Sequence, residues 1–534
     1  MSLSRTLGRL PPAATEYSRE LMDEHWAEAS WLYERRETLV DQQSLVDLDQ
    51  WHRIETRADA HVEGLLAAGR LAIDDCPSRA IDGDAGELHT AIRLLARAEA
   101  FAPFAKLLTS IDWGTPGHAA AVRDALAWDG PDGWAQPVAA LLEAEDTPPL
   151  AASALASAAG LRRWPIAGAL VQRLERSNAG SATLLQALGR LQAAEALPLL
   201  YDRLREGEPA VRRVAARAAL RFEPAEVGAY LAQVARTDAW ATLPLAVCAG
   251  PEAWPVLEAR LDDSPSSDGL LAVGILGATE GIEPLLDALS DETLASAAAE
   301  SLYLLTGAPL YQRVVLVEPV DDGHADDGHA DDGHDDDGHD DDADDGDDND
   351  ADDDDFADDD FADADDDDDA DDDVDADAYD DFDEEQELER TAPRHAPAVT
   401  MAPNDDDDGL VATRLTRDRD RWSAWLRRNE TAFHGPTIRR MRLGVPFEPS
   451  RVLDELALTT CSRRLRSWMI EELAIRHSLA SEYSPLLPVV RQRAALHQAR
   501  RQDAEAEPPV VGAWYLAGLP NVRPRPRPRG TGRS

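Results

Sequence analysis

The chain has 534 residues, of which 104 are acidic and 52 are basic, so its formal net charge is −52. The segment 321–389 alone holds 42 of the acids and no lysine or arginine, whereas residues 409–534 hold 23 arginines against 12 acids. This asymmetry excludes a uniformly acidic protein. The three cysteines lie far apart and form no CxxC pair, which excludes a disulfide scaffold and a thiolate zinc site.

Membrane and secretion signals are missing from the sequence. The first twenty residues lack the apolar stretch of a secretory signal, and no window reaches eighteen consecutive apolar residues. We therefore expect a cytoplasmic protein that has no contact with a membrane. The expected segments are a helical segment at 1–80, helical repeats at 81–320, a disordered acidic low-complexity insertion at 321–408, a second helical segment at 409–515 and a disordered Arg/Pro tail at 516–534.

The N-terminal segment predicts amphipathic helices that carry several aromatic residues. Trp26, Trp31, Leu32 and Leu39 form an apolar set expected to pack against the next helix. Three histidines lie in the same region, at positions 25, 52 and 61, where a ligand site is conceivable. We favour helix packing with polar tips at the surface.

A pattern of paired helices recurs between residues 130 and 310. The second helix of each pair opens with a proline, and these are Pro137, Pro165, Pro198, Pro255 and Pro284. The spacing is 28–33 residues, except for one gap of 57 residues that spans two units. Proline suits the first turn of a helix because the N–H it lacks would be unpaired there.

The first helix of each pair is rich in alanine and glycine. Gly160 and Gly281 are expected to end two of these helices, and Leu199 and Leu285 in the second helices are expected to face the core. Such a hairpin cannot bury its apolar face alone, but stacked hairpins bury a continuous core. The sequence therefore predicts an all-α solenoid. The two helices expected within 452–477 show the same two-helix pattern, so we expect the solenoid to resume after the insertion.

Two stretches, LGRLQAAEALPLL at 188–200 and ILGATEGIEPLL at 275–286, resemble HEAT repeats of the short bacterial type. The stretches 25–72 and 422–477 are similar to the two ends of an uncharacterised bacterial HEAT-repeat family, often encoded near type VI secretion genes. The resemblance implies a HEAT-like α-solenoid with an accessory place beside that secretion system. The family has no established activity, and the Asp-rich insertion departs from its usual pattern.

The acidic insertion opens with four pentads that place His324, His329, His334 and His339 five residues apart. Like charges at this density repel one another and cannot bury apolar surface, so disorder is expected. Calcium would need an EF-hand loop, but the third ligand is missing before both Gly338 and Gly346. We expect weak binding of divalent cations without a defined site, and the four histidines are weak metal candidates only.

Clustered arginines are candidates for binding an anion or a partner. They are Arg213, Arg217, Arg221, Arg439, Arg440, Arg463 and Arg464. A solvated surface is the simplest interpretation, and pairing with the acidic insertion is the next. Nucleic acid is not expected as a partner, because the 42 acids on the same chain would compete for the arginines.

Signatures of catalysis are missing from the sequence. It contains no HExxH, GxSxG, Walker loop or His-Glu dipeptide. We therefore expect no catalysis and no cofactor, and predict a scaffold or adaptor whose partners are other proteins. One alternative is a calcium-responsive or polyanion-mimicking regulator that acts through the Asp-rich insertion. Another is an enzyme of the HEAT-like lyase type.

Overall fold

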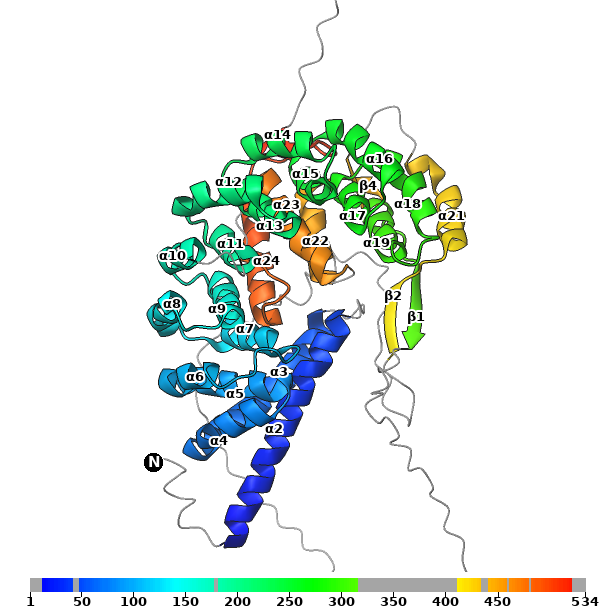
Figure 1. Cartoon of the computed structure of the whole chain (residues 1–534). Helices are drawn as coiled ribbons and strands as arrows, with labels where there is room; N and C mark the ends of the chain where they lie inside the picture. The colour runs from blue at the N-terminus through cyan, green and yellow to red at the C-terminus, as the bar shows by residue number, and fades with distance from the viewer. Residues whose placement is uncertain are drawn as a thin grey trace, which may run out of the picture. The chain divides into compact units, whose positions relative to one another are not determined.

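The computed structural model describes residues 12–41, 48–176, 181–315, 411–433, 440–458, 461–479 and 482–520 (Figure 1). These residues are mostly α-helical, as the sequence predicts. By their internal contacts the described residues belong to one compact unit. The acidic insertion lies outside the described residues. None of the described helices is both long enough and apolar enough to cross a membrane.

Three helices open the first unit: α2 (Pro12–Asp41), α3 (Leu48–Ala68) and α4 (Arg70–Asp82). Helix α2 packs along α3 and α5. Trp26, Leu32 and Leu39 are buried as predicted, but Trp31 is 48% exposed. The prediction for Trp31 is wrong because at about 100° per residue it lies on the face of α2 opposite Trp26.

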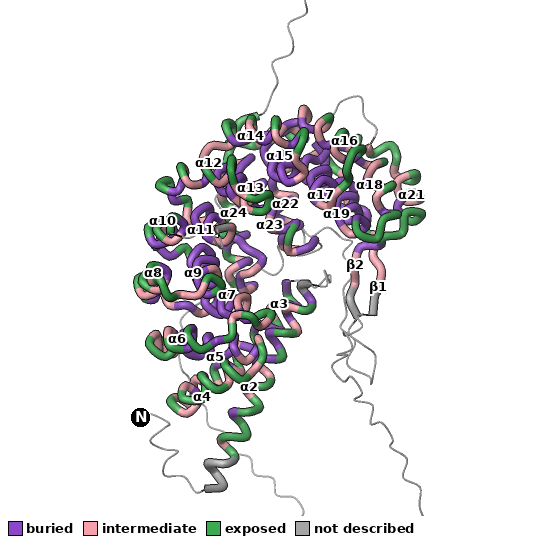
Figure 2. The backbone as a smooth tube through the Cα atoms, viewed as in Figure 1, coloured by how far each residue is buried: buried purple, intermediate pink, exposed green. Residues whose placement is uncertain are grey.

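The following helices form two alternating sets (Figure 1). The inner helices each contact the next inner helix. They are α5 (Ala85–Arg97), α7 (His118–Asp129), α9 (Pro149–Arg162), α11 (Ser181–Leu191), α13 (Pro209–Leu220), α15 (Thr242–Cys248), α17 (Ser267–Leu276) and α19 (Ala295–Thr306). The outer helices are α6 (Phe101–Leu108), α8 (Ala135–Glu143), α10 (Ala167–Arg176), α12 (Leu197–Glu206), α14 (Pro224–Val234), α16 (Trp254–Asp263) and α18 (Ile282–Ala288). Figure 2 shows that the buried residues gather on the inner helices.

Four of the five predicted helix starts in the outer set are confirmed, and the start at Pro165 is not. Pro198 and Pro255 lie in the first turn of α12 and α16. Pro137 and Pro284 are the third residues of α8 and α18, and Pro165 lies just before α10. Short 3-10 turns lead into four outer helices and into α15, and they span Asp132–Trp134, Ala194–Ala196, Ala239–Ala241, Pro251–Ala253 and Thr279–Gly281.

Glycines allow the inner helices to approach closely. A Cβ on Gly160 of α9 would lie 2.9 Å from the Cα of Ala187 on α11, too close for any side chain. Gly160 does not end its helix, contrary to our prediction, because α9 continues to Arg162. Gly281 does not end α17 either, because that helix stops at Leu276, before Gly277 with its φ of 76°.

After α19 the chain forms β1 (Tyr311–Val315), which pairs antiparallel with β2 (Val411–Leu415) across the acidic insertion. Helix α21 (Arg419–Arg428), followed by a 3-10 turn at Glu430–Ala432, contacts α18. We call residues 440–520 the C-terminal segment. It contains the hairpin β3 (Met441–Arg442) and β4 (Val445–Pro446), the helices α22 (Pro449–Leu458), α23 (Arg463–His477) and α24 (Val489–Glu505), and the hairpin β5 (Tyr515–Leu516) and β6 (Leu519–Pro520).

The row of helices does not resume after the insertion, which contradicts our prediction. Helix α23 packs against α15 and α17, α24 contacts α3, and β3 contacts α19 (Figure 1). The C-terminal segment therefore lies along the inner helices. The local pattern predicts its helices but not this docking, which depends on residues more than 200 positions away in the sequence.

The register of the outer helices gives a first test. Leu285 is fully buried, as predicted, but Leu199 is only half-buried and its neighbour Leu200 takes the core position. We expect Leu285→Ala to lower the free energy of unfolding by about 2–5 kcal/mol. Leu199→Ala should cost clearly less. Urea unfolding followed by circular dichroism measures both, and equal losses would contradict this register.

Candidate functional site

The C-terminal segment donates hydrogen bonds to carbonyls at the ends of inner helices. The last four carbonyls of a helix have no partner within it, so buried helix ends need donors from outside. The backbone N–H groups of Met441, Leu443 and Gly444 reach Gly277, Leu304 and Leu305 at 2.7–3.0 Å, and the indole N–H of Trp514 reaches Leu276 at 3.0 Å. The segment therefore caps α17 and α19.

Three buried arginines extend this capping. Arg440, Arg442 and Arg476 surround one carboxylate, that of Glu472 on α23, and all four side chains are fully buried. The distance from Arg442 Nη2 to Glu472 Oε2 is 2.5 Å. Burial and the neighbouring Arg476 hold the pKa of Arg440 well below its usual value.

Helix carbonyls offset part of this excess positive charge. Nη2 of Arg476 donates to the carbonyls of Ala246 and Ala249 at 2.6 and 2.8 Å, at the end of α15. Nη2 of Arg440 donates to the carbonyl of Ile275 at 3.1 Å, near the end of α17. A helix C-terminus carries partial negative charge, so it is a favourable place for a guanidinium.

A second ion-pair cluster joins α13 to α23. Nε of Arg217 lies 2.7 Å from one carboxylate oxygen of Glu471, and Nε of Arg221 lies 2.6 Å from the other. Burial alone would raise the pKa of Glu471, but the two arginines lower it to about 2. Glu471 is therefore ionised at neutral pH and ties α23 to the row.

A third contact joins a buried carboxylate of α19 to the first turn of α23. Both oxygens of Glu300 on α19 accept hydrogen bonds from Ser462, one from its N–H at 2.6 Å and one from its Oγ at 3.0 Å. Ser462 is the N-cap of α23, and its Oγ also accepts from the N–H of Leu465. Burial raises the pKa of Glu300 to about 7, although the bonds from Ser462 oppose this.

The arginines that we expected to bind an anion or a partner are engaged within the chain. Arg440 is fully buried, so the interpretation of that residue as a surface site is wrong. Arg439 lies outside the described residues. The others pair with carboxylates: Arg213 and Arg464 with Asp268, Arg217 and Arg221 with Glu471, and Arg463 with Glu37. These partners come from the folded part of the chain and not from the acidic insertion.

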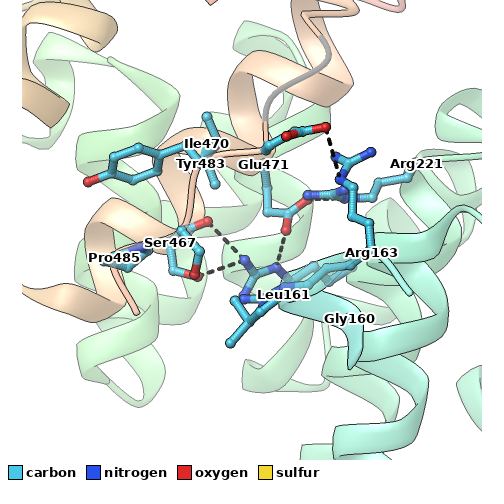
Figure 3. Close-up of a pocket in the computed structure, with 13 residues that line it drawn as sticks. Gly160, Leu161, Arg163, Arg221, Ser467, Ile470, Glu471, Tyr483 and Pro485 are labelled. Atoms are coloured by element: carbon cyan, nitrogen blue, oxygen red, sulfur yellow. Dashed lines mark hydrogen bonds and ion pairs between the residues drawn. The ribbon is translucent and has the colours of Figure 1, made fainter. Parts of the chain in front are cut away.

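A small pocket lies where α9, α11 and α13 meet α23 and the loop that follows it (Figure 3). Its volume is about 20 Å³. Charged and hydroxyl groups dominate the lining: Arg163, Arg190, Arg217, Arg221, Ser467, Glu471, Glu482, Tyr483 and Ser484. A second cavity of about 10 Å³ shares Arg190, Arg217, Arg221 and Glu471 with it. Arg190 is not among the arginines that the sequence pattern singled out.

Metal ligands do not gather in the part of the chain that the structure describes, where no group of three His, Cys, Asp or Glu side chains could hold an ion. His25 and His61 do meet, with 3.0 Å between their Nδ1 atoms. His52 lies half-buried on α3. The weak metal candidates His324, His329, His334 and His339 lie outside the described residues.

Helix α2 has an exposed apolar stripe on the face that does not pack on α3 and α5. Tyr17, Leu21 and Trp31 are 66%, 40% and 48% exposed, although their type is usually buried. At 100° per residue, Leu21 and Trp31 each lie about 40° around the helix axis from Tyr17, one on each side of it. The buried Trp26 lies on the opposite face. The guanidinium of Arg35 lies 5.1 Å from the centre of the Trp31 ring. We call Tyr17, Leu21 and Trp31 the α2 stripe.

Comparisons with protein-family models, with curated proteins and with solved structures give no match to this chain.

Sequence reasoning missed the carboxylates that hold the C-terminal segment. Glu300 lies within the run AAAESLYLLT, and Glu471 with Glu472 interrupts the apolar run WMIEELAI. Acids flanked on both sides by apolar residues indicate buried carboxylates, and buried carboxylates need partners. That signal could have directed attention to the unassigned arginines.

Removing the Glu472 carboxylate tests the buried cluster. Glu472→Gln leaves three buried guanidiniums without their anion, so we expect the free energy of unfolding to fall by about 3–5 kcal/mol. The matched control is Glu482→Gln, whose carboxylate is 60% exposed and 3.9 Å from Arg163. That variant should change stability by about 1 kcal/mol or less. Equal losses in urea unfolding would argue against the cluster.

The raised pKa of Glu300 predicts a pH dependence of stability. Its pKa is about 7 in the folded chain against an ordinary 4.5, so its contribution is fully present below pH 4.5 and is lost as the pH rises through 7. Glu300→Gln cannot ionise. Between pH 5 and pH 8 the wild-type protein should therefore lose about 1–3 kcal/mol of stability relative to this variant.

The control for this pH dependence is the exposed Glu280, for which Glu280→Gln should give a constant difference across the same range. Glu455, whose pKa burial also raises to about 7, is present in each protein and largely cancels in the comparison. A constant difference for Glu300→Gln as well would rule out ionisation of Glu300 in this range.

Proposed function

We propose that this chain is a HEAT-like α-solenoid that acts as a non-catalytic scaffold or adaptor for other proteins. The alternation of inner and outer helices, each inner helix in contact with the next, supports this architecture. Stacked hairpins of this kind offer long surfaces and depend on their neighbours for a core. The resemblance of residues 188–200 and 275–286 to HEAT repeats points the same way.

The observation that carries the proposal is the α2 stripe. Exposed aromatic and aliphatic side chains that share one helix face are typical of a protein-binding surface. The stripe runs over about 21 Å, from Tyr17 to Trp31, at 1.5 Å per residue. Glu20 and Glu24 are exposed on the same side of α2. The partner that fits has an apolar helix face flanked by lysine or arginine.

The inner helices are a less favourable docking surface in this architecture. The C-terminal segment already contacts α15, α17 and α19, and its arginines take up the carbonyls at their ends. A partner would have to displace buried ion pairs there, which is costly. A scaffold with a filled inner side binds through its outer helices and through α2.

A cytoplasmic place beside a type VI secretion system is part of this proposal and rests on the resemblance of residues 25–72 and 422–477.

The test is capture of a partner by the full chain in its own cell, with a photo-crosslinking residue in place of the exposed Ala27 between Leu21 and Trp31. The stripe variant carries Tyr17→Ser, Leu21→Ser and Trp31→Ser. We expect the wild-type chain to crosslink a protein that has a basic, apolar helix, and the stripe variant to lose at least about nine-tenths of it, as loss of central apolar anchors does elsewhere.

The matched control replaces three other exposed apolar residues, Leu150, Val490 and Val510, by serine. It removes a similar apolar area and should keep the crosslink. Circular dichroism confirms that both triple variants are folded. Equal crosslinking by the two variants, or no crosslinked protein with the wild-type chain, would reject the α2 stripe as the docking surface.

A further inference from the structure

Arg190 is a partly buried arginine on α11. Among the described residues no hydrogen bond or ion pair engages its guanidinium, although it is only partly exposed and lines both cavities beside α23. Arginine is a costly residue to bury in this way, because its five N–H donors need acceptors. The nearest carboxylate, Glu471, is already occupied by Arg217 and Arg221.

The charges around Arg190 do not balance. The larger pocket is lined by four arginines, at positions 163, 190, 217 and 221, against the two carboxylates of Glu471 and Glu482. Burial and the nearby Arg217 lower the pKa of Arg190 to about 9, because the site opposes a further positive charge. A bound anion would relieve this opposition.

The surroundings suit an anion that has several oxygens. A guanidinium presents a planar fork of donors that matches carboxylate and phosphate oxygens. Ser467 adds a hydroxyl on the pocket wall, and Figure 3 shows the side chains of Ser467 and Glu471 from α23 facing the arginines of the row. Arg163 meets Glu482 at 3.9 Å in a long pair at the surface, which an incoming anion can replace at little cost.

We propose that the Arg190 pocket binds a single oxyanion group, a phosphate or a carboxylate, between the row of helices and α23. A volume of about 20 Å³ is little more than the space that one water molecule needs, so one oxygen of the anion enters and the rest of the group stays at the mouth of the pocket. The bound group pairs with Arg190 and accepts a hydrogen bond from the Ser467 hydroxyl. This site is independent of the α2 stripe and of the scaffold function.

Inorganic phosphate is the probe, titrated into the full chain at constant ionic strength because exposed charges are screened by salt. Calorimetry gives the dissociation constant, and thermal unfolding gives the stabilisation by bound ligand. We expect saturable binding by the wild-type chain. Arg190→Gln should weaken it at least about tenfold, because a charge-assisted hydrogen bond is lost. The control is Arg236→Gln, an exposed arginine outside both cavities, which should bind phosphate as the wild-type chain does.

The unfolding temperature measured without phosphate distinguishes an anion-binding role of Arg190 from a purely structural one. Arg190→Gln removes an uncompensated charge, so it should unfold at the same temperature as the wild-type chain or higher, and should lose the stabilisation by phosphate. Arg190→Lys should keep part of the binding. Acetate that competes with phosphate shows that the site also accepts a carboxylate, and acetate that fails to compete assigns a phosphate. Unchanged phosphate binding by Arg190→Gln, or no saturable binding by the wild-type chain, overturns the proposal.

Discussion

The carbonyl groups at the ends of α15, α17 and α19 impose the constraint on which the rest of the fold depends. These helix ends are covered by the C-terminal segment, so water cannot satisfy them and protein donors must. The donors are backbone N–H groups around β3 and the guanidiniums of Arg440 and Arg476. Buried guanidiniums in turn require an anion, and Glu472 of α23 supplies it.

The position of α23 follows from this chain of requirements. Glu471 and Glu472 are adjacent and therefore point about 100° apart around the helix. One carboxylate enters the arginine cluster at the helix ends, while the other reaches Arg217 and Arg221 on α13. A rotation of α23 by one residue would move the carboxylates of Glu471 and Glu472 away from their arginine partners. Buried ion pairs add little net stability, but their geometry admits few alternative registers.

Local features of the fold could be predicted from the sequence, and distant ones could not. The prolines of the outer helices and the burial of Leu285 depend on contacts within one or two repeats, where periodicity carries the information. Leu199 was expected to face the core, but the adjacent Leu200 takes that position together with Leu204, one turn further along α12. The arginines were interpreted as surface residues because a charged stripe looks the same whether water or a carboxylate covers it. Only the fold brings Arg217 to Glu471, 254 positions along the chain.

The pairing of β1 with β2 has a consequence for how this gene can vary. Val315 lies opposite Val411, so the two ends of the polypeptide between them lie side by side. Doubling the length of such a connection costs only about 0.6 kcal/mol in closure entropy. Its first part is a tandem repeat of pentads that open with DDGH. A change in the number of pentads therefore costs little closure entropy and still allows Val315 to pair with Val411.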